Sequence, residues 1–101
     1  MQTESRVKPR GPLFPLGHIV ATPGALRTLL LAETDGRKLL ARHEAGDWGD
    51  VDREDWAAND RAMLEDTRIF SAYALGDTGE RIWIITEADR SATTLLRPDE
   101  Y

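Results

Sequence analysis

The sequence contains no cysteine, no long apolar run and only two histidines, and each shortage excludes a class of function. Without cysteine the chain cannot form disulfides, use a catalytic thiolate or hold zinc through sulfur. Apolar runs such as Leu29–Ala32 are far shorter than the ~20 residues that a membrane-spanning helix needs. The polar, basic start of the chain is unlike a secretory signal, so a cytoplasmic location is favoured. No cofactor is expected, because the sequence has neither a phosphate-binding glycine loop nor a metal-ligand pattern.

The remaining composition fits one small globular domain. The 101 residues are 41% hydrophobic and 31% charged, a balance typical of a folded chain. Residues 1–13, which include Pro9 and Pro12, are interpreted as a flexible N-terminal tail. Residues 14–101 are interpreted as a single domain. Phe14 and Leu16 are apolar enough to dock the end of the tail on that domain.

Two to three short helices are expected in the first part of the domain. Thr22 is an N-cap with Pro23 at the first helical position, and this helix should run to about Ala32. A second helix is expected at residues 36–45, and a third from a cap at Asp52 to about Leu64. The residues expected on their apolar faces are Leu26, Leu29 and Leu30, then Leu39, Leu40 and His43, then Trp56, Ala57, Ala58, Ala62 and Met63.

From Arg68 onward the apolar pattern changes to the alternation of β-strands. Strands are expected at residues 68–75, 81–87 and 92–97, with turns between them. This spacing predicts an α+β fold that ends in a three-stranded antiparallel β-meander. Helices on one face of the sheet are expected to bury Ile82, Ile84, Phe70 and Leu96. The short run Ile19-Val20-Ala21 could add an N-terminal strand beside the last strand, whose edge otherwise invites a second chain.

The negative charge is concentrated in one fifth of the chain. Residues 47–66 contain eight acidic and two basic side chains, a net charge of −6, against −5 for the whole chain. Direct nucleic-acid binding is not expected there, because contacts to phosphate need Lys and Arg. A protein partner with a basic surface is favoured instead. The predicted partner-binding residues are Asp47, Trp48, Asp50, Glu54, Asp55 and Asp60.

The segment Gly46–Asp50 is the most distinctive part of this acidic region. Two glycines bracket Trp48 and permit an unusual backbone path. Trp48 has two interpretations: an exposed anchor for the partner, or an aromatic plug between two helices. The neighbouring carboxylates lack the ligand spacing of a calcium loop, and Asp52 and Asp55 serve better as helix caps. No metal site is therefore predicted.

A second polar cluster spans Thr86–Thr94. Small ribonucleases on antiparallel sheets use a carboxylate as base, an arginine on the phosphate and a histidine as acid. Glu87, Arg90 and His18 could form such a set, so a small ribonuclease-like toxin is the alternative interpretation. The simpler interpretation is turn chemistry between two strands. The acidic charge of the chain counts against RNA cleavage, so a binding protein is favoured over an enzyme.

Three stretches of the sequence carry a resemblance: Phe14–Leu26, Ala41–Asp50 and Ile82–Tyr101. They are similar to small bacterial proteins described as plasmid-related, which are carried on plasmids and integrated mobile elements. The resemblance covers roughly residues 14–101 and implies an accessory role on a mobile element, without assigning catalytic residues. A more specific version of the binding hypothesis is an inhibitor of a host defence nuclease, of the restriction or CRISPR type, in which the clustered carboxylates imitate DNA phosphates. Monomer and homodimer both stay open.

Overall fold

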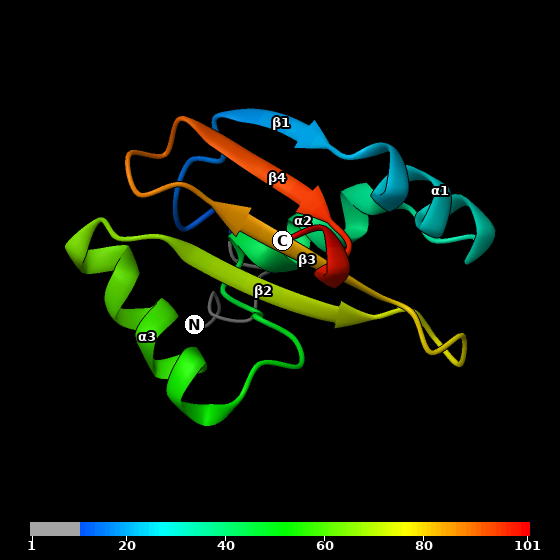
Figure 1. Ribbon diagram of the computed structural model, residues 1–101. Coiled ribbons are helices and arrows are strands. Elements are labelled where there is room, and N and C mark those ends of the chain that lie inside the picture. Colours follow the sequence, from blue (N-terminus) through cyan, green and yellow to red (C-terminus); the bar gives the residue numbers. More distant parts are fainter. Residues whose placement is uncertain (1–10) are drawn as a thin grey trace, which may run out of the picture.

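Four strands form one sheet in residues 11–101, the part of the chain that the computed structural model describes. Most of the predicted tail, residues 1–10, lies outside the described residues. The elements are β1 (His18–Ala21), α1 (Pro23–Leu31), α2 (Gly36–Glu44), α3 (Arg53–Glu65), β2 (Ile69–Ala74), β3 (Arg81–Thr86), β4 (Ala92–Leu96) and the 3₁₀ turn η2 (Pro98–Glu100). In Figure 1, α2 lies behind the sheet, α1 lies beyond the end of β1, and α3 lies alongside β2. The predicted α+β class is confirmed.

The sheet has one strand more than the predicted meander. β2, β3 and β4 pair antiparallel, while β1 adds to the other side of β4 in parallel, giving the order β1-β4-β3-β2. The sheet is therefore mixed and four-stranded, and the predicted three-stranded antiparallel meander is only a part of it. Backbone hydrogen bonds fix the added strand: the amide of His18 donates to Ser91 and that of Thr22 donates to Leu95, both at 3.0 Å.

The helices begin at their capping residues. The side chains of Thr22, Asp35 and Asp52 each accept a hydrogen bond from a backbone amide in the first turn of α1, α2 and α3. Such bonds satisfy amides that a helix start leaves without an intrahelical acceptor. The observed helix ends differ from the predicted ones by one residue. None of the helices in residues 11–101 is long and apolar enough to cross a bilayer.

The main core fills one face of the sheet. Leu29 of α1 and Leu39 of α2 pack there with Tyr73, Ile82 and Ile84 from the strands. All five side chains are at most 6% exposed. Period-two alternation places every second residue of a strand on this face, which is why Ile82 and Ile84 are covered by the same helices.

The opposite face of the sheet holds two residues that the sequence predicts in the main core. Phe70 meets Trp83 edge to face, with ring centroids 4.9 Å apart, and Leu96 is the cross-strand partner of Trp83. Trp83 lies between Ile82 and Ile84 in β3, so it points away from the core that they line. The prediction that Phe70 and Leu96 share a layer with Ile82 is therefore wrong. The face of the sheet away from the main core therefore carries Phe70, Trp83 and Leu96.

A second, smaller core joins α3 to the sheet. Its buried residues are Phe14, Trp48, Ala62 and Ile69. The predicted apolar face of α3 is only partly right: Ala62 is buried, but Trp56 keeps 37% of its surface exposed. Ala57 and Ala58 are also exposed, while the polar Asn59 is buried. The helix therefore meets the sheet through a narrow contact that includes a polar side chain.

Candidate functional site

The loop before α3 folds onto the outer edge of β2. The amide of Asp50 donates to the carbonyl of Ala72 at 2.7 Å, and the amide of Ala72 donates to the carbonyl of Trp48 at 3.1 Å. Gly49, between these bonds, has a φ of 77°, and a Cβ there would collide with the Ala72 carbonyl oxygen. Only glycine allows the loop to approach β2 so closely. The backbone bridge between this loop and Ala72 of β2 therefore explains why residue 49 is a glycine.

Trp48 is fully buried, with 0% of its surface exposed. Its indole Nε1–H donates to the carboxylate of Asp60 at 3.0 Å, and its ring packs against Phe14 and His43. The interpretation of Trp48 as an exposed anchor is therefore wrong, and the plug interpretation describes the structure. The same hydrogen bond engages one oxygen of Asp60, so this predicted contact residue also has an internal role.

Two further predicted contact residues form ion pairs within the chain. Asp47 accepts from the guanidinium of Arg42 at 2.7 Å, and Asp50 pairs with Arg81 at 3.3 Å. The hydrogen bond from Arg42 holds the pKa of Asp47 below its usual range. Both carboxylates keep about half of their side-chain surface exposed, 46% and 54%. Since a neighbouring cation offsets each charge, they add less to the attraction of a basic partner than α3 does.

The remaining predicted carboxylates, Glu54 and Asp55, lie exposed in the first turn of α3. Negative charge is favourable there because the amide groups at a helix start carry partial positive charge. Asp52 caps this turn through a 2.8 Å bond to the amide of Asp55. This cap uses only the backbone amide of Asp55, and Asp55 is one of the residues that line a groove beside the helix.

This groove has a volume of about 290 Å³ and lies between α3 and the sheet face that carries Trp83. The Trp83 ring contacts both Phe70 and Tyr101, the latter with ring centroids 5.7 Å apart. The guanidinium of Arg68 lies 5.6 Å from the centre of the Tyr101 ring, a cation–π arrangement. The full lining is Asp55, Ala58, Asn59, Arg68, Phe70, Trp83, Ile85 and Tyr101.

The groove was not predicted from the sequence, although one signal for it existed. Alternation in β3 requires Trp83 to point away from Ile82 and Ile84, and the pairing of β2 with β3 then places Phe70 beside it. The acidic helix and these aromatic residues are brought together only by tertiary packing. Asp55 is the predicted site residue that belongs to both.

Asn59 holds α3 beside β2 and thereby sets the width of the groove. Its side-chain amide donates to the carbonyl of Phe70 at 2.6 Å and accepts from the amide of Phe70 at 3.0 Å. The two bonds reproduce the pairing that a neighbouring strand would make. With the loop bridge at Ala72, they close the outer edge of β2.

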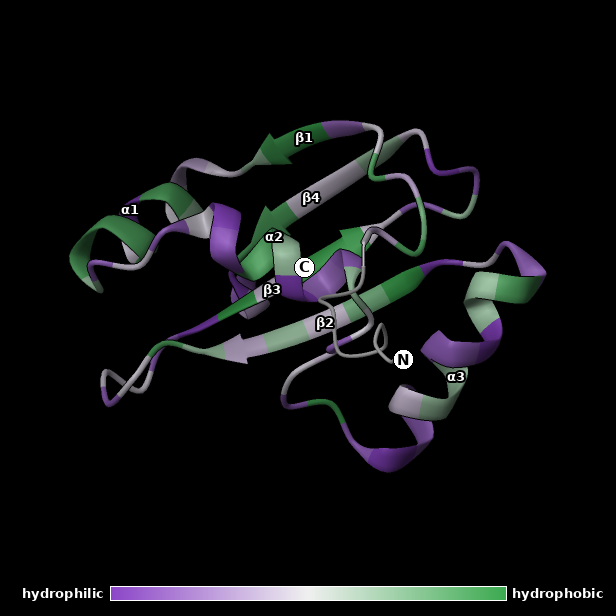
Figure 2. Cartoon of the chain, turned by 180° about the vertical axis from the view of Figure 1, so that it is seen from behind, coloured by the Kyte–Doolittle hydropathy of each residue, from purple (hydrophilic) through white to green (hydrophobic). Residues whose placement is uncertain are grey.

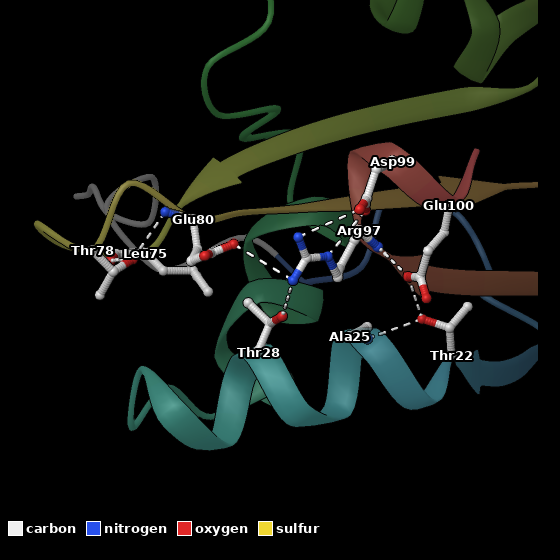
Figure 3. Close-up of polar contacts among 9 residues, drawn as sticks. All are labelled: Thr22, Ala25, Thr28, Leu75, Thr78, Glu80, Arg97, Asp99 and Glu100. Carbon is white, nitrogen blue, oxygen red and sulfur yellow. Dashed lines mark hydrogen bonds and ion pairs between the residues drawn. The ribbon is translucent and has the colours of Figure 1, made fainter.

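The other wall of the groove is fixed by polar contacts at the end of the chain (Figure 3). The Glu100 carboxylate accepts from the hydroxyl of Thr22 and from the amide of Arg97, both at 2.7 Å. The Arg97 guanidinium donates to the hydroxyl of Thr28 at 3.2 Å. These bonds tie η2 to α1. Tyr101, the next residue, is thereby held over the sheet face beside Trp83.

The alternative catalytic residues lie at one end of the sheet but are not joined into a site. The Arg90 guanidinium donates to the carbonyls of Thr67 at 2.7 Å and Ala62 at 2.9 Å, and to two carbonyls of its own turn. It therefore ties the end of α3 to the β3–β4 turn. Within residues 11–101, no hydrogen bond or ion pair links the side chains of Glu87, Arg90 and His18.

His43 lies in a buried chain of hydroxyl groups. Its Nδ1 is 2.6 Å from the Ser71 hydroxyl and its Nε2 is 2.9 Å from that of Thr86. Thr86 bonds to Thr93, which donates to the carbonyl of Leu16. Because a carbonyl only accepts, Thr93 and Thr86 each donate along the chain, and Nε2 of His43 must carry a hydrogen. Burial lowers the pKa of His43 to about 4, and with 0% exposure the ring cannot reach a substrate.

Among the described residues, Asp55 in the first turn of α3 lines a groove with aromatic walls. In residues 11–101, no group of three or more His, Asp or Glu side chains is arranged to hold a metal ion. No family model matches the chain, and no curated protein or solved structure matches it either.

Proposed function

We propose that this chain is a protein-binding module that takes a basic segment of its partner against the first turn of α3 and the adjoining aromatic groove. The observation that carries the proposal is the position of Asp55, which belongs to the acidic turn and also lines the groove. Residues 47–66 carry a net charge of −6, and the part of it that Arg42 and Arg81 do not offset by pairing with Asp47 and Asp50 supports a basic partner. The direct contact residues are then Glu54, Asp55 and the aromatic residues of the groove.

The two parts of this surface contribute differently to binding. The carboxylates of Glu54 and Asp55 attract the partner over a distance and speed its association, an effect that salt screens. The groove supplies the buried contact, and aromatic residues are common binding hot spots. A volume of about 290 Å³ is small for a cofactor site and suits one large side chain. An arginine of the partner would stack on the aromatic rings and pair with Asp55, and it would compete there with Arg68, whose guanidinium already lies over Tyr101.

A more specific form of the proposal is an inhibitor of a host defence nuclease in the cytoplasm. The resemblance to plasmid-related proteins supports such a role on a mobile element. α3 has 13 residues and is therefore about 20 Å long, and it carries exposed carboxylates in its first turn and again at Glu65. Placed on a DNA-binding surface, these carboxylates would occupy the positions of phosphate groups.

The test is the capture of partners from a bacterial lysate by the immobilised chain and three variants. Glu54→Lys/Asp55→Lys reverses the charge of the acidic turn. Tyr101→Ala removes one wall of the groove at a residue that is 66% exposed, so the fold should be retained. The control, Glu33→Lys/Asp77→Lys, makes the same change in charge on loops at the opposite end of the molecule from α3 (Figure 1).

A partner held by the wild type and by the control, but lost from the other two variants, is the expected result. A partner retained equally by all four proteins would contradict the proposal. For the inhibitor form, duplex DNA should displace the captured nuclease, since both ligands would compete for one surface. Continued binding at saturating DNA would exclude imitation of DNA while leaving the simpler binding proposal intact.

A further inference from the structure

The two edges of the sheet are finished in different ways. The outer edge of β2 is closed by Asn59 and by the loop bridge at Ala72. At the other edge, no strand of residues 11–101 lies beyond β1. The backbone of His18 and that of Thr22 bond to β4, so alternation turns the amides and carbonyls of Ile19 and Ala21 outward. β1 therefore offers two donors and two acceptors to another strand.

Apolar side chains surround this open edge. Ile19 and Val20 of β1 are 49% and 47% exposed, and Leu26 and Leu30 of α1 are 57% and 76% exposed. Figure 2 shows α1 and most of β1 as hydrophobic, whereas hydrophilic and hydrophobic residues alternate along α3. Leu26 and Leu30 were expected on the buried face of their helix, but Leu29 alone of the three is buried. A larger assembly would cover the other two.

Three of these side chains, Ile19, Leu26 and Leu30, line a second groove with a volume of about 380 Å³. It runs between β1, α1 and α2, and its apolar walls include Ile19, Ala21, Leu26, Leu30 and Leu40. Ala21 leaves room beside the strand because its side chain is small, whereas Ile19 on the same face protrudes. The edge thus carries a projecting side chain and a recess two residues apart.

We propose that this face binds a second copy of the chain, with β1 antiparallel to β1 of the partner subunit about a two-fold axis through Val20. Such an axis brings the same surface of both subunits together, as closed dimers require. Ile19 then lies opposite Ala21 of the partner subunit and fills the recess beside Leu26 and Leu30. Four backbone hydrogen bonds join the two strands, and the two four-stranded sheets become one.

The exposed apolar area is sufficient for such a dimer. A fully exposed aliphatic side chain offers about 150 Å², so the exposed fractions of Ile19, Val20, Leu26 and Leu30 amount to roughly 350 Å² per chain. Two chains would bury ~700 Å² of apolar surface, and homodimer interfaces are about 65% apolar. The whole interface is then ~1,000 Å², where specific interfaces begin. The α3 groove lies at the other edge of the sheet and stays accessible in this arrangement.

The test uses the absence of cysteine from the chain. In the proposed register Val20 faces Val20 of the partner subunit in a non-hydrogen-bonded pair, whose Cβ atoms lie ~4.5 Å apart, within the range of a disulfide. Val20→Cys should therefore form a covalent dimer under mild oxidation. The control Thr78→Cys, in the exposed β2–β3 turn, should stay predominantly monomeric under the same conditions.

The second test measures the molecular mass of the chain and of its cysteine-free variants by analytical ultracentrifugation. The wild type should have the mass of two chains, and Ile19→Lys/Leu30→Lys should have the mass of one with an unchanged circular dichroism spectrum. The acidic-turn variant Glu54→Lys/Asp55→Lys should remain dimeric, because α3 is not part of this interface. A wild-type chain that sediments as a monomer at NMR concentrations, or a Val20→Cys protein that cross-links no faster than the control, would overturn the proposal. Binding of an extended apolar peptide at this edge to a monomeric wild type would also overturn it.

Discussion

Acidification from pH 7 towards pH 4 should weaken this fold through His43. The ring is fully buried and is held in its neutral form between Ser71 and Thr86. Burial lowers its pKa from 6.5 to about 4. Between these two values the unfolded chain binds a proton that the folded chain does not. The free energy of unfolding therefore falls as the pH falls through this window, and above about pH 7 it does not depend on His43.

The magnitude follows from the interval between the two pKa values of His43, 6.5 and about 4. At 1.36 kcal/mol for each pH unit, complete titration costs about 3 kcal/mol, and about 2 kcal/mol of this should be lost by pH 5. Domains of this kind typically unfold with 5–15 kcal/mol. The change is therefore a substantial part of the stability and is large enough to measure.

Urea unfolding at pH 7, 6 and 5, followed by circular dichroism, measures this effect. His43→Gln should lose about 1–3 kcal/mol at pH 7, because glutamine replaces the two buried hydrogen bonds imperfectly, and its stability should then be almost constant down to pH 5. His18→Gln, at an exposed residue of β1, should keep the wild-type dependence. A wild-type midpoint that does not move between pH 7 and 5, or a His43→Gln protein with the wild-type slope, would refute the reasoning.

Three substitutions test the contacts that position the groove, each by urea denaturation. Gly49→Ala should lower the free energy of unfolding by about 3 kcal/mol, because the new Cβ collides with the Ala72 carbonyl. Gly79 also has a left-handed backbone but lies in open space, so Gly79→Ala should lower it by only about 1 kcal/mol. Equal losses for the two variants would contradict the backbone bridge between Gly49 and Ala72. Asn59→Ala should cost about 2–3 kcal/mol, and Asn59→Asp should cost at least as much, because a carboxylate oxygen would then face the Phe70 carbonyl oxygen at a buried position; an unchanged midpoint for both would exclude this role. Arg90→Lys should cost about 1–2 kcal/mol, since an ammonium group cannot reach the same set of carbonyls, and a loss within error would show that water replaces them.

The ends of the helices could be predicted because their chemistry is local. The Thr22 hydroxyl bonds to the amide of Ala25, and Asp52 bonds to that of Asp55, each only three residues away. A sequence window of a few residues contains both partners of such a bond. The alternation from Ile69 onward is local in the same way, so the three antiparallel strands were predicted at nearly the observed residues.

The parallel pairing of β1 could not be predicted with the same certainty. It joins His18 to Ala92 across most of the chain, and a four-residue strand has no pattern that selects its neighbour. Alternation also shows that Ile82 and Trp83 point to opposite faces without showing which face the helices cover. Because Phe70 was expected on the face with Ile82 and Ile84, its contact with Trp83 on the opposite face, and therefore the aromatic groove, was not predicted.

The negative charge of the candidate site could be predicted from the sequence, but the aromatic groove beside it could not. The acidic first turn of α3 could be recognised from Glu54, Asp55 and the cap at Asp52. The burial of Trp48 depends on Asp60 and Phe14, contacts that only the folded chain defines. The same is true of the internal ion pairs of Asp47 and Asp50, which offset two of the charges predicted to meet the partner.

The central claim is that the first turn of α3 and the aromatic groove bind one segment of the same partner. Calorimetric titration of the captured partner against wild type, Asp55→Asn, Tyr101→Ala and the double variant tests it most directly. Each single change should weaken binding by about tenfold, which is 1.4 kcal/mol. Because the two side chains line one groove, their losses in binding free energy should not be additive. Wild-type affinity in the double variant would contradict the claim, as would two losses that add independently.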